Sequence, residues 1–150
     1  MFQIVTILAV LTSMVWAFFS PIWGWTPLVL NTCIVLFFLL ASKKMKWKHV
    51  DELSPMANAL IQQFGHFYAS PHAGRGLSAS SSTIQFGAAV VGIVDAFHGF
   101  WWGLAIGTVF WFGMSAAAVA FNPTVFLRDP IQQAAHREVI DWIDKRRERA

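Results

Sequence analysis

The sequence predicts an all-α integral membrane protein with four transmembrane helices, arranged as two antiparallel hairpins, and two cytoplasmic amphipathic helices at the membrane interface. Two observations predict this class. Of the 150 residues, 56% are hydrophobic and only 13% are charged, whereas soluble domains average about 45–50% apolar and about 25% charged residues. The apolar residues also gather in two blocks, each long enough for two of the roughly 20-residue helices that cross a bilayer. The composition excludes an ordinary soluble enzyme, a disordered chain and, with its single cysteine, a disulfide scaffold.

The first hairpin is expected within residues 1–42. An uncharged apolar run over 2–19 ends at a Ser-Pro pair, and a second run covers 28–41. Two tryptophans lie between the runs, and the amphipathic indole ring favours the membrane–water interface. The first run has neither a basic residue before it nor a small-residue cleavage site after it, so we expect an uncleaved span rather than a signal peptide.

The second hairpin is expected within residues 78–121, with spans at 78–97 and 100–121. Asp95 and His98 are the polar interruption of this block. An ionised Asp at the bilayer centre costs about 2.5–3.5 kcal/mol, whereas a turn between two helices is a much less costly place for it. We therefore expect the turn to follow Asp95, with this side chain close to the membrane surface.

The basic residues predict the orientation. All eleven Lys and Arg lie in 43–77 or in 122–150, and none lies in either turn. By the positive-inside rule these two segments, and with them both termini, face the cytoplasm. We expect a multi-pass protein of a bacterial-type inner (plasma) membrane. The same rule accounts for the net charge of +3, so this charge does not indicate nucleic-acid binding.

Each cytoplasmic segment is predicted to contain one amphipathic helix. The segment 43–77 is a basic loop followed by a helix over 54–69 and then by a flexible basic loop at Gly74-Arg75-Gly76. The segment 122–150 contains a helix that begins at Asp129-Pro130. Both helices start with an N-cap residue followed by Pro at the first helical position. The apolar faces either lie in the lipid headgroup layer, with bound lipid, or bind a partner protein. The residues of this partner or lipid surface are Met56, Leu60, Phe64 and Phe67 in the first helix and Ile131, Ala135, Val139, Trp142, Lys145, Arg146 and Arg147 in the second.

Small residues recur at four-residue spacing in the second hairpin. Such a stripe lets two helix backbones approach closely, and in lipid these contacts drive much of helix association. The stripes either pack the two spans of the hairpin against each other or face another protomer or a partner subunit. The first hairpin has no such stripe. The small residues are Ala88, Gly92 and Ala96 in the third span and Gly99, Gly103 and Gly107 at the start of the fourth.

Asp95 and His98 form the candidate polar site. They are three residues apart and can share one helix face, and ionisable groups inside membrane spans mark proton relays and transport paths. His98 is also the one candidate ligand for a haem or a pigment, because the other histidines are predicted outside the spans. The sequence contains no metal-ligand spacing and no catalytic motif, so no catalytic residue and no metal site are assigned, and any cofactor is left unknown.

These features predict a non-catalytic structural or accessory subunit of a multi-subunit membrane complex, with other membrane subunits and the bilayer as its partners. Small-residue stripes, interfacial helices and the lack of a catalytic motif are typical of such a subunit. The alternative is a small homo-oligomeric channel, pore or transporter assembled through the stripe at Gly99, Gly103 and Gly107. A third hypothesis is a pigment- or haem-binding membrane protein that uses His98.

Overall fold

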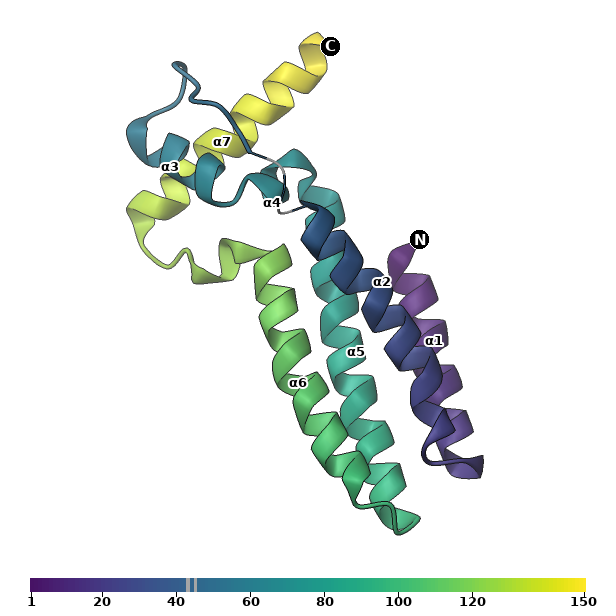
Figure 1. Ribbon diagram of the computed structural model, residues 1–150. Coiled ribbons are helices and arrows are strands. Elements are labelled where there is room, and N and C mark those ends of the chain that lie inside the picture. Colours follow the sequence, from purple (N-terminus) through teal and green to yellow (C-terminus); the bar gives the residue numbers. More distant parts are fainter. Residues whose placement is uncertain (43, 45) are drawn as a thin grey trace.

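A computed structural model describes residues 1–42, 44 and 46–150, and every regular element in these residues is a helix (Figure 1). Four stretches are long and apolar enough to cross a membrane, as the sequence predicted. The first is α1 (Phe2–Phe19), and the second combines the 3₁₀ turn η1 (Trp23–Trp25) with α2 (Thr26–Ser42). The third and fourth are α5 (Pro71–Phe97) and α6 (Trp102–Phe121).

Helix α5 is the central member of the four. It packs against α6 over most of their length and also contacts α1 and α2 (Figure 1). The side chains between the helices form one buried cluster, in which Leu28, Ile84 and Val91 are fully buried. Buried polar groups in a lipid environment need partners within the protein, and the two buried polar residues of α1, Thr6 and Ser13, bond to α2. Asn31 Nδ2 donates to Thr6 Oγ1 at 3.0 Å, and the Leu28 backbone N–H donates to Ser13 Oγ at 3.1 Å.

Helix α5 begins at Pro71, whereas the sequence predicted a span that starts at residue 78. The glycines at 74 and 76 indicated a flexible loop, because glycine is a poor helix former. The structure overrides this propensity through packing. A Cβ atom at Gly74 would lie only 2.9 Å from the carbonyl oxygen of Phe121 and from the Phe67 ring, so glycine allows α5 to pass close to both.

Helices α3 (Pro55–Gln63), α4 (Gly65–Ala69) and α7 (Pro130–Arg149) form a second unit at the end of α5 where both termini lie (Figure 1). We call residues 46–70 and 127–150 the extramembrane module. The two predicted helix starts are confirmed: Ser54 Oγ accepts from the Ala57 N–H, and an Asp129 carboxylate oxygen accepts from the Ile131 N–H at 2.9 Å.

The helix predicted over 54–69 is interrupted between α3 and α4. Phe64 leaves helical geometry, with φ −115° and ψ 33°, and Gly65 follows it. The Trp47 indole N–H donates to the Gly65 carbonyl oxygen at 2.9 Å, which ties the segment before α3 to the start of α4. The break lets α4 turn toward α5 and α7, so Phe67 and Tyr68 enter the core of the module.

The module has its own hydrophobic core, and this corrects part of the predicted surface. Leu60 and Phe67 are buried against Ala135 and Val139 of α7, with exposed fractions of 5% or less, so these side chains cover one another. Phe64 and Trp142 are partly buried at the edge of the same core. The predicted surface positions that are exposed are Met56, Ile131, Lys145, Arg146 and Arg147.

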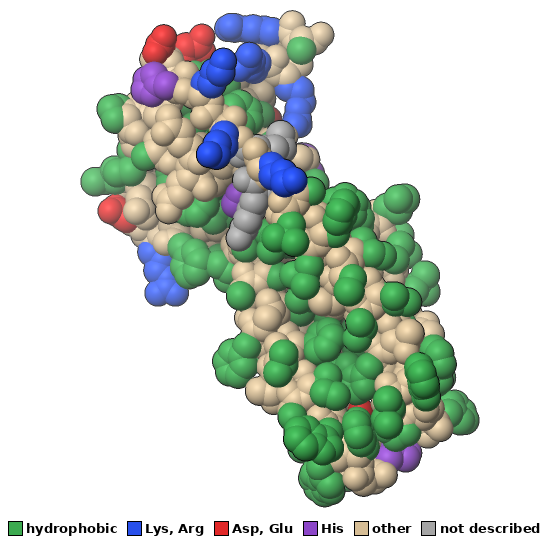
Figure 2. Space-filling view, in the orientation of Figure 1, with side chains coloured by type: hydrophobic (Ala, Val, Ile, Leu, Met, Phe, Trp, Pro, Cys, Tyr) green, Lys and Arg blue, Asp and Glu red, His purple; other side chains and the backbone are tan. Residues whose placement is uncertain are grey.

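The two units differ in surface chemistry. Figure 2 shows hydrophobic side chains over the four long helices and Lys and Arg side chains gathered around the extramembrane module. Phe19, Phe37 and Phe112 are each more than half exposed on the long helices. Apolar surface of this extent is what a lipid-facing helix bundle presents, and the segregated basic residues match the charge pattern expected at one membrane face.

Candidate functional site

The contact between α5 and α6 is built from small residues of both helices. A Cβ atom at Gly92 would lie 2.7 Å from the carbonyl oxygen of Gly103, and one at Gly107 would lie 3.0 Å from the carbonyl oxygen of Ala88. Both distances are shorter than side chains tolerate against a rigid backbone, so only glycine permits this separation of the helices. Ala88, Gly92, Gly103 and Gly107 therefore lie where one helix of the chain meets the other.

Two of the predicted small residues are placed differently. Ala96 is half-buried near the end of α5, and Gly99 is exposed in the turn that follows. A Cβ atom at Gly99 would meet nothing within 4 Å. The residue has a φ of +82°, however, which residues other than glycine rarely adopt. Gly99 shapes the turn between α5 and α6 rather than the contact between them.

Asp95 is fully buried in the last turn of α5, and its side chain faces the interior of the helix bundle. Its Oδ2 accepts a hydrogen bond of 2.7 Å from the indole N–H of Trp25, which comes from η1. A Cβ atom at Gly103 would overlap the Asp95 side chain, so glycine at this position makes room for the carboxyl group. Oδ1 has no hydrogen-bond partner among the described residues.

The structure adds the direction of the Asp95 side chain, which the sequence did not predict. The residue precedes the turn, as predicted, but its side chain points inward because the helix phase at this position faces α6 and η1. No local sequence pattern identified Trp25 as the partner of Asp95, since both tryptophans of the first turn were expected at the interface. Trp23 fits that expectation and is 66% exposed, whereas Trp25 is only 5% exposed.

His98 is exposed at the end of α5 and does not join Asp95 in a site. Its Nδ1 lies 2.9 Å from the Val94 carbonyl oxygen, and its ring meets the Phe18 ring edge-on with centroids 6.0 Å apart. The two residues that the sequence placed together thus differ in burial, with Asp95 inside the bundle and His98 at its surface.

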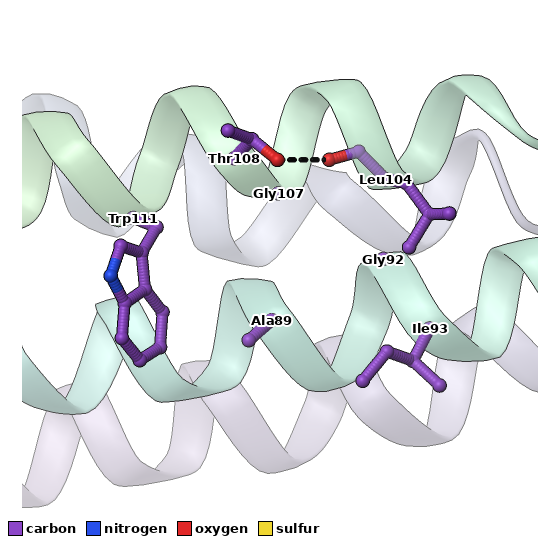
Figure 3. Close-up of a pocket in the computed structure, with 7 residues that line it drawn as sticks. All are labelled: Ala89, Gly92, Ile93, Leu104, Gly107, Thr108 and Trp111. Atoms are coloured by element: carbon purple, nitrogen blue, oxygen red, sulfur yellow. Dashed lines mark hydrogen bonds between the residues drawn. The ribbon is translucent and has the colours of Figure 1, made fainter.

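A groove runs along the outer face of α5 and α6, beside their contact, and faces away from α1 and α2 (Figure 3). Its volume is about 240 Å³. Gly92 and Gly107 form part of its floor, while Ile93, Leu104 and Trp111 stand at its edges (Figure 3). The Thr108 hydroxyl also lines the groove, but it donates to the Leu104 carbonyl oxygen of its own helix at 2.8 Å, so the groove is apolar.

A polar contact inside the extramembrane module was not predicted from the sequence. The Tyr68 hydroxyl lies 2.8 Å from His136 Nδ1. Burial raises the pKa of Tyr68 to about 12. Burial, and then the nearby positive charge of Arg75, lower the pKa of His136, so both groups are neutral at pH 7. The contact joins α4 to α7 within the module.

Helix α7 is fixed to the rest of the module by two further contacts. Glu138 accepts hydrogen bonds from the backbone N–H and the hydroxyl of Ser54, at 2.8 and 2.7 Å. The Trp142 indole N–H donates to a carboxylate oxygen of Glu52 at 2.8 Å. The module is therefore a rigid support for the exposed basic residues at the end of α7.

Comparison of the chain with models of known protein families, with curated proteins and with solved structures found no match.

We predict that Gly92→Ala weakens the packing of α5 against α6. The added methyl group would overlap the Gly103 carbonyl oxygen, and overpacking of this kind typically costs about 1–3 kcal/mol. The matched control is Gly113→Ala on α6, where a Cβ atom meets nothing within 4 Å and the helix gains up to about 1 kcal/mol from the better helix former. Thermal unfolding of both variants in detergent, followed by circular dichroism, measures the difference. Equal melting temperatures for the two variants would contradict the close helix contact.

We also predict that Trp25→Phe destabilises the protein while Trp23→Phe does not. The first change leaves both oxygens of the buried Asp95 carboxyl without a partner, which costs about 1–3 kcal/mol. The second change affects an exposed ring in the same turn. Asp95→Asn retains an acceptor for the Trp25 N–H and should be better tolerated than Trp25→Phe. The same unfolding measurement ranks the three variants, and a Trp25→Phe variant as stable as Trp23→Phe would show that the hydrogen bond contributes nothing.

Proposed function

We propose that this chain is a non-catalytic accessory subunit of a multi-subunit membrane complex. The groove between α5 and α6 is the observation that carries the proposal. In this function the groove receives a transmembrane helix of a partner subunit, and the extramembrane module offers a second, charged surface at the membrane face.

The groove suits a helix better than it suits lipid alone. Helix association in a bilayer depends on close van der Waals packing, which small residues at the contact permit. Gly92 and Gly107 in the floor leave room for a bulky apolar side chain from the partner, between the edges formed by Ile93 and Trp111. Exposed apolar residues continue this face on both helices, including Phe86 at 67% and Phe112 at 70% exposure.

A homo-oligomeric channel or transporter is the alternative, with a second copy of the chain in the groove. The lining argues against it, because the only hydroxyl there, on Thr108, is bonded within its own helix. Asp95, the carboxylate that a transporter would use, faces the other side and is bonded to Trp25. A ring assembled through this groove would therefore have no polar path along it.

We further propose that the chain spans a bacterial-type inner membrane with both termini in the cytoplasm. The segregation of Lys and Arg around the module supports this orientation (Figure 2). In a Cys33→Ala background, we predict that Lys46→Cys resists a membrane-impermeant thiol reagent in intact cells, whereas Trp101→Cys reacts. Both positions are exposed. Reaction at position 46 from outside would overturn the orientation.

The mass and composition of the native assembly, solubilised gently from its own membrane, test the function. We expect a large particle that contains several different chains. Thr108→Phe fills the groove and should release the chain from this particle, whereas Val109→Phe should not, because Val109 is 71% exposed on the same helix and does not line the groove.

Each other outcome contradicts part of the proposal. A ring of identical chains would favour the channel, and a lone monomer would exclude an accessory subunit. If the mixed particle keeps the chain in both variants, or loses it equally in both, the groove is not the docking site.

A further inference from the structure

A small cavity at the junction of α5 and α7 lies apart from the groove and from Asp95. Its volume is about 140 Å³, well below the roughly 300–1,000 Å³ of pockets that hold drug-sized ligands. Helix α5 contributes His72 and Arg75, and α7 contributes Asp144 and Arg147. Ile140 and Ile143 of α7 form an apolar wall. A cavity of this size and lining has room for one small polar group beside an apolar chain.

The charges of the cavity favour an anion. Two guanidinium groups and one imidazole surround it, against the single carboxylate of Asp144. Among the described residues, neither Arg75 nor Arg147 forms an ion pair or a side-chain hydrogen bond. The donors of both arginines are thus free to bind an oxyanion, and the guanidinium group matches phosphate oxygens with two parallel hydrogen bonds.

The length of α5 places the cavity at the level of the lipid headgroups. At 1.5 Å per residue its 27 residues span about 40 Å, whereas the hydrocarbon core is about 30 Å thick. If the core ends near Phe97, the remaining 10 Å corresponds to about seven residues, which are those from Pro71 to Leu77. The headgroup layer is about 5–7 Å thick on each side, so Arg75 lies within it.

We propose that this cavity binds the phosphate group of an anionic phospholipid. Arg75 and Arg147 hold the phosphate oxygens, and Ile140 and Ile143 contact the glycerol and the start of an acyl chain. Basic pockets at the ends of transmembrane helices are suited to such headgroups. The proposal requires the chain to be in a membrane, but it does not depend on the accessory-subunit function.

Binding of three probes to the purified full-length protein in detergent tests the proposal. The probes are phosphatidylglycerol, zwitterionic phosphatidylcholine and inorganic phosphate, each titrated and followed by native mass spectrometry. We expect phosphatidylglycerol to bind more tightly than either of the others. Arg75→Gln and Arg147→Gln should each weaken its binding about fivefold, since a basic residue near an anionic lipid surface contributes about 1 kcal/mol.

The matched control is Arg128→Gln, which removes an exposed arginine at the same membrane face but outside the cavity. Unchanged phosphatidylglycerol affinity in this variant, with weaker binding in the other two, supports the proposal. Equal losses in all three variants would show attraction by overall charge and would overturn it. Tight binding of inorganic phosphate without phosphatidylglycerol binding would assign the cavity to a soluble phosphate and also overturn it.

Loss of folding is separated from loss of the site by two comparisons. Circular dichroism in the absence of lipid reports whether Arg75→Gln keeps the helical content of the unchanged protein. Arg147 is exposed near the end of α7, so Arg147→Gln tests the cavity with little effect on the module core. If Arg147→Gln is folded and binds phosphatidylglycerol as the unchanged protein does, the proposal is wrong.

Discussion

Helices α5 and α6 approach each other closely, and the other helices of the bundle pack around this pair. Lipid provides no hydrophobic force between helices, so the pair is held by dispersion contacts between backbones that only small side chains allow. Gly92 and Gly107 provide this closeness. Helix α5 then serves as the common partner of α1, α2, α4 and α6. A change in the position of α5 would alter both the bundle and the extramembrane module at once.

Gly103 has a different task from the other small residues, although it follows the same four-residue spacing. It faces the side chain of Asp95 and provides the space that the carboxyl group occupies. Trp25 of η1 lies on the other side of the Asp95 carboxyl group, and its indole N–H donates to that group. The centroids of the Trp25 and Phe110 rings are 5.4 Å apart. A buried polar group in lipid is costly unless it is paired. The pair therefore fixes η1 against α5 and α6 at the end of the bundle opposite the module.

The sequence predicted the features that depend on composition and on local chemistry. It did not predict the features that depend on contacts between residues far apart in the chain. The four spans and the helix starts at Ser54 and Asp129 follow from hydropathy and capping, so they were found. The early start of α5 depends on the contact of Gly74 with Phe67 and Phe121, which no local pattern reveals. For the same reason the inward direction of Asp95 was missed, because its partner Trp25 lies 70 residues away in the chain.

An apolar helix face predicts burial, but it does not predict which surface packs against it. The apolar faces of α3, α4 and α7 pack against one another, since Leu60 and Phe67 pack against Val139. This packing fixes the direction of α7, so that its basic end passes beside the first turns of α5 and Arg147 meets the cavity that Arg75 lines. Arg75 is there because α5 is longer than the hydrocarbon core is thick. Residues 71–77, which lie before the predicted third span, thus lengthen the central helix and bring Arg75 beside α7.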